Sequence, residues 1–312
     1  METLPKCLLL PVDGSQESLR PAQFLADLYP RRDTIDIILC YFLPPLPPIY
    51  RQRPDSPEMY AKLKAMQTVR DKNKRSILDR AREFLISMGF SGEHIQEHVE
   101  EKALSVGRQT CVLAERKKVD AVLVQKQVVR SLEDFLSSDI SSALLQHCLT
   151  SPIWLIDGNV DPSRAVILLE DEHASLRAVD HAAFMLEETD THITLLYLAK
   201  SVKAALKCPA FSLDAEMGEW LKSSAGKDVL PILMEAKAIL KEGGVSEERL
   251  DLTVLPGRGN KASEVTSYCR EAGIGIVVLG HSHPTGIWSF LKSSVTQKML
   301  TELHDMALWI NQ

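Results

Sequence analysis

The stretch LGHSHPTGIWSFLKSSVTQ, residues 279–297, carries residue types that could bind a phosphate group. Gly280 has no side chain, so the backbone there could approach an anion closely. The imidazoles of His281 and His283 could donate hydrogen bonds to it. A Ser-Ser-Val-Thr run then begins an apolar helix, whose free N–H groups and hydroxyls could hold the same anion: Ser293, Ser294, Val295 and Thr296. His-x-His alone is weak evidence for a metal site, and we predict none.

The elements that position this stretch follow an alternating pattern of short apolar runs and longer amphipathic runs. We predict strands at 6–12, 34–42, 95–100, 120–125 and 152–157, then at 164–170, 191–199, 250–256, 275–280 and 307–311. Predicted helices lie at 16–29, 58–89, 105–118, 138–149, 174–187, 229–242, 261–272 and 294–304. This alternation indicates an α/β fold with parallel sheets covered by helices on both faces.

The chain repeats itself in order. Ser18-Leu19-Arg20 matches Ser175-Leu176-Arg177, DFLSSDI matches SFLKSSV, and SPIWLID matches MALWINQ. Trp154 and Trp309 are 155 residues apart, and the other matched segments keep nearly the same offset. We therefore predict a tandem duplication with two domains, 1–157 and 164–312, joined by the turn-rich segment DGNVDPSR. The matched residues Trp154 and Trp309 could simply be core residues.

The bulk composition excludes several classes of protein. The 312 residues carry a net charge of −6, so there is no basic excess for general nucleic-acid binding. No apolar run is long enough to span a membrane, and the six scattered cysteines are typical of reduced thiols. We expect a cytoplasmic protein. Two segments interrupt the pattern, the Pro-rich 43–57 and the irregular 201–226, and each could be a lid, a partner surface or, as we favour, a plain connection.

The strand-VDGS-helix start, the repeat, and the late glycine loop before a Ser/Thr-rich helix start together resemble the universal stress protein family in its tandem form. The resemblance implies two Rossmann-like (adenine nucleotide alpha hydrolase-like) domains, each with a five-stranded, mainly parallel sheet. It also implies that the last strands of two units pair, so SPIWLID and MALWINQ could pair within one chain as a pseudo-dimer. A homodimer of tandem chains also stays open. ATP-binding members of the family carry an Asp after the first strand. They also carry a late Gly-x-x-Gly, nine further residues and Gly-Ser/Thr.

The family's Asp corresponds to Asp13 in the first half and to Glu170 in the second. Either carboxylate could accept a hydrogen bond from a sugar hydroxyl or a base amine. The competing interpretation is a turn or helix-cap residue, shared with Ser15 in the first half. Both interpretations stay open for Asp13, and the turn is favoured for Glu170.

The late glycine pattern differs between the halves. In the second half its positions are Gly280, His283 and Ser293-Ser294, so one glycine and the hydroxyl-rich helix start remain. In the first half they are Gln125, Val128 and Ser138-Asp139, so we do not expect that half to bind ATP in the family manner. Gly257, in LPGRGNKASEV with Gly259 and Lys261, could let the backbone approach an adenosine, although a strand-to-helix turn is slightly favoured.

Three functions compete. The first is a non-enzymatic stress-response protein whose second half binds ATP or a related adenine nucleotide as a regulatory signal. The second is a nucleotide-independent binding module that acts through protein contacts or another small ligand. The third is an enzyme such as a slow ATPase. We predict no enzyme and no catalytic residues, because the sequence has no Walker-type loop, no Gly-x-Ser-x-Gly and no His-Glu-x-x-His.

Overall fold

A computed structural model of the chain describes residues 4–50, 56–126, 140–148, 150–170, 172–211, 215–257, 261–280, 299–302 and 304–311, and the structural statements below concern these residues. Within them, no helix is long and apolar enough to cross a membrane. Six predicted site residues lie outside the described residues: His281, His283, Ser293, Ser294, Val295 and Thr296.

A single eleven-stranded sheet runs through the molecule in the order β3-β2-β1-β4-β5-β11-β10-β6-β7-β9-β8. The strands of the first half are β1 (Lys6–Pro11), β2 (Ile35–Leu43), β3 (Ile95–Glu101), β4 (Ala121–Gln125) and β5 (Ile153–Ile156). Those of the second half are β6 (Arg164–Leu169), β7 (His192–Ala199), β8 (Leu206–Pro209), β9 (Leu250–Pro256), β10 (Ile276–Gly280) and β11 (Ala307–Asn311). Neighbouring strands are parallel except in the pairs β5–β11 and β8–β9.

Both halves have the same strand order. If the parallel strands of each half are numbered 1 to 5 along the chain, their order in the sheet is 3-2-1-4-5 in both halves. The antiparallel strand β8 is an addition to the second half. This is a doubly wound Rossmann-type arrangement, and the order reverses between β1 and β4 and between β6 and β10. The predicted fold class is confirmed, and the shared order agrees with the repeat in the sequence. The domain limits 1–157 and 164–312 stay a prediction.

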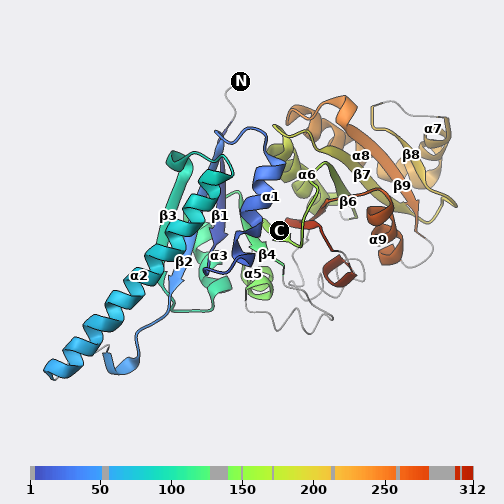
Figure 1. The fold of residues 1–312 in the computed structure, drawn as a ribbon. Helices are drawn as coiled ribbons and strands as arrows, with labels where there is room; N and C mark the ends of the chain where they lie inside the picture. Colours follow the sequence, from blue (N-terminus) through green and yellow to red (C-terminus); the bar gives the residue numbers. More distant parts are fainter. Residues whose placement is uncertain are drawn as a thin grey trace.

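Helices cover both faces of the sheet (Figure 1). One face packs against α1 (Arg20–Leu28), α2 (Pro57–Ser87), α6 (Glu172–Leu186), α7 (Ala215–Lys222) and α8 (Ser224–Glu242). The other packs against α3 (Val106–Lys117), α5 (Ser141–His147) and α9 (Lys261–Glu271). Successive strand residues point to opposite faces, so Leu8 and Leu10 join the first core and Leu9 joins the second. Continuously apolar strands are therefore buried on both sides, as predicted.

The two halves join through an antiparallel pair of strands. In β5 and β11, Trp154 lies opposite Trp309, and their rings stack with centroids 3.7 Å apart and planes 3° apart. Both side chains are fully buried. Trp154 Nε1 donates a hydrogen bond to His181 Nε2 at 3.1 Å. The predicted pairing of SPIWLID with MALWINQ within one chain is confirmed, and the two tryptophans are core residues as well.

Four elements differ from the sequence prediction. The first helix begins at Arg20, after a 3-10 turn at Glu17–Leu19. Segment 201–226 contains β8 and α7, which have no periodic signal because β8 is short and half-exposed. The helix predicted at 229–242 begins earlier, where the Ser223 hydroxyl caps the Gly226 N–H. The helix predicted at 294–304 is not one of these four, because it lies mostly outside the described residues and stays a prediction.

The long helix α2 extends beyond the sheet as an arm (Figure 1). It begins where the Ser56 hydroxyl accepts a hydrogen bond from the Met59 N–H. Only its second half is anchored in the core, through Leu78, Ala81 and Leu85.

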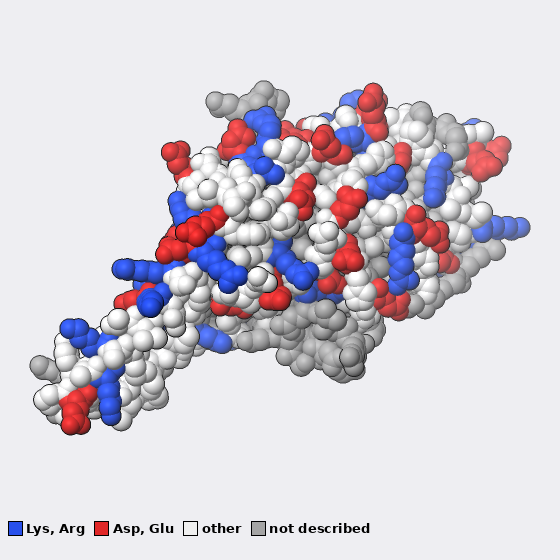
Figure 2. Space-filling model, in the orientation of Figure 1, with Lys and Arg blue, Asp and Glu red and all other residues white. Residues whose placement is uncertain are grey.

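Over the face seen in Figure 2, basic and acidic side chains are interspersed on the body of the molecule.

Candidate functional site

The first candidate site lies where the strand order reverses in the first half. A cavity of about 670 Å³ opens at the carboxyl ends of β1, β4 and β5. Its lining includes Asp13 after β1, Lys126 after β4 and Asp157 after β5. His304 and Asp305, which precede β11, bring the second half to the same cavity. Crevices in this position are the usual ligand sites of doubly wound sheets, and a volume of this size suits a small molecule.

Asp13 is held in a turn at the edge of this cavity. Its Oδ1 accepts hydrogen bonds from the Ser15 N–H at 2.8 Å and from the Ser15 hydroxyl at 2.6 Å. Partial burial alone would raise the pKa of Asp13, but the hydrogen bonds from Ser15 and Ser18 hold it below its ordinary value. The carboxylate is thus ionised and committed to the turn, as one of the two interpretations predicted. A direct ligand contact from Asp13 stays a prediction.

A buried ion pair closes the floor of the cavity. Lys126 Nζ lies 2.8 Å from Asp157 Oδ2, and both side chains are more than nine-tenths buried. His304 Nδ1 lies 3.2 Å from the same oxygen. The backbone supports the pair, because the Lys126 N–H donates to Ile156 O and the Asp157 N–H donates to Met306 O. An ammonium and a carboxylate therefore lie beside the first position of the family's glycine pattern, Gln125, where a phosphate cradle would need open backbone.

Lys126, Asp157 and His304 were not among the site residues predicted from the sequence. A polar residue directly after each of two continuously apolar strands, VLVQK and WLID, is a signal that could have identified Lys126 and Asp157. No local signal could have identified His304, because its contact depends on the pairing of β5 with β11.

The second candidate site lies at the corresponding edge of the second half. Glu170 follows β6, Gly257 follows β9 and Gly280 ends β10. The topology brings all three to the carboxyl edge of the sheet, on both sides of the reversal point. Lys261, the first residue of α9, is close enough to act on the Glu170 carboxyl. The three described members of the set predicted in the second half thus lie at one edge of the sheet.

Glu170 combines a turn role with an exposed position. Its N–H donates to the Ser175 hydroxyl at 3.0 Å, which joins β6 to the start of α6. Desolvation by the surrounding protein raises the pKa of the carboxyl, and the positive charge of Lys261 opposes this effect. The residue itself is exposed, so the carboxylate can still meet a ligand.

The two described glycines allow close packing of the backbone. A Cβ on Gly280 would lie 2.1 Å from the carbonyl oxygen of Ala174, so only glycine lets α6 approach β10 this closely. Gly257 donates its N–H to Ala199 O at 2.9 Å, and a Cβ there would lie 3.3 Å from the Ala199 backbone. The packing of α6 against β10 accounts for Gly280 without a ligand, whereas Gly257 lies against the end of β7. The turn and adenosine interpretations of Gly257 both stay predictions.

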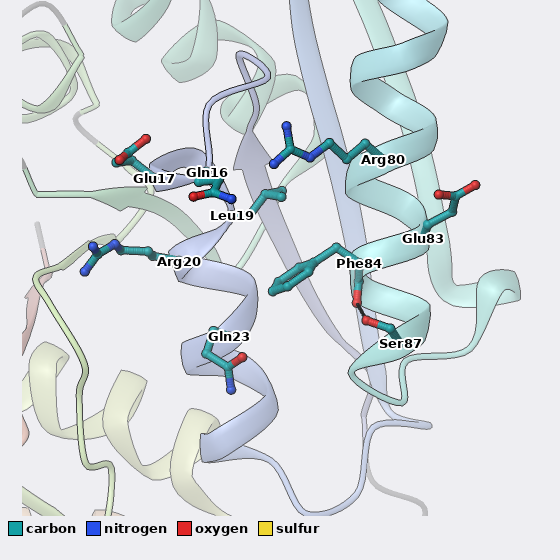
Figure 3. A pocket seen from close by; sticks show the side chains of 9 residues that line it. All are labelled: Gln16, Glu17, Leu19, Arg20, Gln23, Arg80, Glu83, Phe84 and Ser87. Carbon is teal, nitrogen blue, oxygen red and sulfur yellow. Dashed lines mark hydrogen bonds between the residues drawn. The ribbon is translucent and has the colours of Figure 1, made fainter.

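A second cavity, of about 630 Å³, lies between α1 and α2 (Figure 3). Leu19 and Phe84 are its apolar lining residues, and Figure 3 shows the Phe84 ring directed from α2 toward α1. Arg80 reaches from α2 toward the loop before α1, where its Nη1 donates to Gly14 O at 3.4 Å. Glu17 also lines the cavity of the first candidate site. The 3-10 turn before α1 therefore lies between the two cavities.

Both halves have the same strand order, and in each half polar residues lie where that order reverses. These features define a Rossmann-like α/β protein. Residues 6–155 match the model of the universal stress protein family. The universal stress protein YxiE of Bacillus subtilis is 21% identical over 144 residues, which cover 44% of this chain and 90% of that protein. Over residues 6–155, the chain is therefore similar to the universal stress protein family.

Solved structures extend the likeness of fold to the whole chain. The universal stress protein of Archaeoglobus fulgidus is similar over 99% of this chain and 97% of that chain, with a TM-score of 0.63 and 11% identity. A universal stress protein family protein of Arabidopsis thaliana with AMP bound covers 51% of this chain and 95% of its own, with a TM-score of 0.35 and 15% identity.

Proposed function

We propose that this protein is a non-enzymatic stress-response protein that binds ATP or a related adenine nucleotide in its second half as a regulatory signal. The observation that carries the proposal is the convergence of Glu170, Gly257 and Gly280 at the carboxyl edge of the sheet, where its strand order reverses. Glu170 would accept a hydrogen bond from a ribose hydroxyl, and Lys261 would attract phosphate. The predicted phosphate contacts from His281, His283 and the run 293–296 belong to the same proposal.

Binding is tested by calorimetry with ATP and AMP on the purified chain, after extraction of any nucleotide that copurifies. Glu170→Gln and Lys261→Met remove one acceptor and one cation from exposed positions and should each weaken binding. Ser294→Ala probes the expected helix start. Gly280→Val is a poor probe, because its side chain would overlap the start of α6 whether or not a ligand binds.

Asp13→Asn serves as the matched control in the first half. If ATP affinity falls in Asp13→Asn and is unchanged in Glu170→Gln, the nucleotide binds in the first half and the proposal is wrong. If the chain holds no nucleotide and gives no heat at millimolar ATP, the nucleotide proposal fails altogether.

A second candidate, the nucleotide-independent binding module, is supported by the first half. There the Lys126–Asp157 pair and His304 occupy the end of β4 and β5. This arrangement favours protein contacts or another small ligand at the first candidate site, where the strand order of the first half reverses. Calorimetry in which neither half binds ATP or AMP would favour this candidate.

A further inference from the structure

A separate polar cavity lies at the opposite edge of the sheet in the second half. Its volume is about 710 Å³, and Arg164, His192 and Asp251 line it at or near the amino ends of β6, β7 and β9. The proposed nucleotide site lies at the opposite, carboxyl ends of the parallel strands of this half. The cavity is therefore independent of the proposed nucleotide site.

The additional strand β8 forms one wall of this cavity. It pairs antiparallel with β9, so that Lys207 lies opposite Thr253. The strand comes from segment 201–226, which has no counterpart in the first half. With the 155-residue offset of the repeat, Thr253 corresponds to His98, which bonds to Glu100 at 2.9 Å while Arg116 bonds to the same carboxylate. The cavity lining is thus particular to the second half.

Hydroxyl groups form the buried floor. Thr194, Thr253 and Tyr268 line the cavity and are each more than nine-tenths buried. Thr253 Oγ1 lies 3.4 Å from the Tyr268 hydroxyl, so these two share a long hydrogen bond. The Thr194 hydroxyl has no hydrogen-bond partner in the described part of the chain. A ligand hydroxyl that enters the cavity could donate to the Thr194 hydroxyl or accept from it.

The charged groups that line the cavity are the cations of Lys207 and Arg164 and the carboxylates of Asp251 and Glu271, so an anion could bind only at the two cations. Lys207 Nζ lies 5.2 Å from the centre of the Tyr268 ring, and Arg164 Nη1 donates to Ala272 O at 3.1 Å. Within the described ranges, neither cation pairs with a carboxylate. Asp251 Oδ2 lies 2.8 Å from His192 Nε2, and Asp251 lies opposite Thr194 in the register of the β7–β9 pair.

We propose that this cavity binds a monosaccharide phosphate. Lys207 and Arg164 hold the phosphate, because both side chains donate hydrogen bonds and carry fixed positive charge. Thr194, Thr253 and Tyr268 bond to the sugar hydroxyls, and Asp251 accepts from one of them. A hydroxylated anion satisfies the cations and the buried hydroxyls together, which a simple anion or a neutral sugar cannot do.

The test measures binding of glucose 6-phosphate to the full chain by calorimetry or ligand-observed NMR. We expect Lys207→Met to weaken binding by about tenfold or more and Thr194→Val by about fivefold, with unchanged melting temperatures. The matched controls are Lys222→Met at an exposed position of the same segment and Thr68→Val on the exposed arm, and neither should change affinity. Glucose and inorganic phosphate should each bind at least about tenfold more weakly.

Four results would overturn the proposal. They are no binding at about 10 mM glucose 6-phosphate, equal affinity for glucose or for inorganic phosphate, unchanged affinity in both cavity variants, and displacement of the sugar phosphate by AMP. The last result would assign both ligands to one site. Failure of ATP binding with glucose 6-phosphate binding intact would remove only the proposed nucleotide function.

Discussion

Replacement of Trp309 by alanine tests how the two halves are held together. Trp309 and Trp154 are fully buried and stack at 3.7 Å between β5 and β11. Removal of a buried tryptophan side chain costs about 3–5 kcal/mol through lost burial and the cavity left behind. A stacked aromatic pair adds about 0.5–1.5 kcal/mol beyond its burial. We therefore expect Trp309→Ala to lower the free energy of unfolding by about 4 kcal/mol.

The assay is urea unfolding followed by far-ultraviolet circular dichroism, in a double-mutant cycle with Trp154→Ala. Once one ring is gone, the other has lost its stacking partner, so the two losses should differ from additivity by about 1 kcal/mol. Trp220, a buried tryptophan that bonds to Ser201 away from the junction, is the matched control. The losses from Trp220→Ala and Trp309→Ala should add within about 0.5 kcal/mol.

A loss below about 1 kcal/mol for Trp309→Ala would refute the continuous sheet, because the ring would then be exposed instead of buried. Additive losses for the Trp154 and Trp309 pair, within about 0.3 kcal/mol, would mean that the rings do not meet.

Three further outcomes follow from buried groups. Gly280→Ala should destabilise the chain by about 1–3 kcal/mol in thermal melts, because its Cβ would overlap Ala174 O, and an unchanged melt would contradict that packing. Lys126→Met should cost about 3 kcal/mol in urea, and the cost should shrink when Asp157→Leu is added, since the double variant leaves no unpaired charge. Burial lowers the pKa of His181 to about 3, so the unfolded chain binds a proton below its ordinary pKa of 6.5 while the folded chain does not. Stability should therefore fall by up to about 1.4 kcal/mol per pH unit as pH drops below 6.5, and His181→Gln should flatten that slope.

Much of the fold could be predicted because its signals are local. Continuously apolar runs such as AVLVQ and GIVVLG became buried parallel strands. The repeat matched Trp154 with Trp309, and the family resemblance implied that their strands pair, as they do. The strand β8 could not be predicted in this way. It is four residues long with only Cys208 buried, and its hydrogen bonds come from β9, more than 40 residues further along the chain.

The candidate sites were less predictable than the fold. Glu170, Gly257 and Gly280 gather at one edge as their strand ends predicted, yet Gly280 has a packing role that spacing alone does not reveal. The ion pair of Lys126 with Asp157 depends on the neighbouring strands β4 and β5, and the His304 contact depends on the junction of the halves.

The sequence by itself determined the class of fold, the duplication and the strand ends that carry polar residues, because hydrophobic periodicity and repeated segments are written along the chain. The tertiary structure decided which polar groups meet. It formed the Lys126–Asp157–His304 cluster and enclosed the cavity between β8 and α9. Those contacts join residues that are distant in sequence, and burial of a charge or hydroxyl depends on the elements that pack around it and not on its neighbours along the chain.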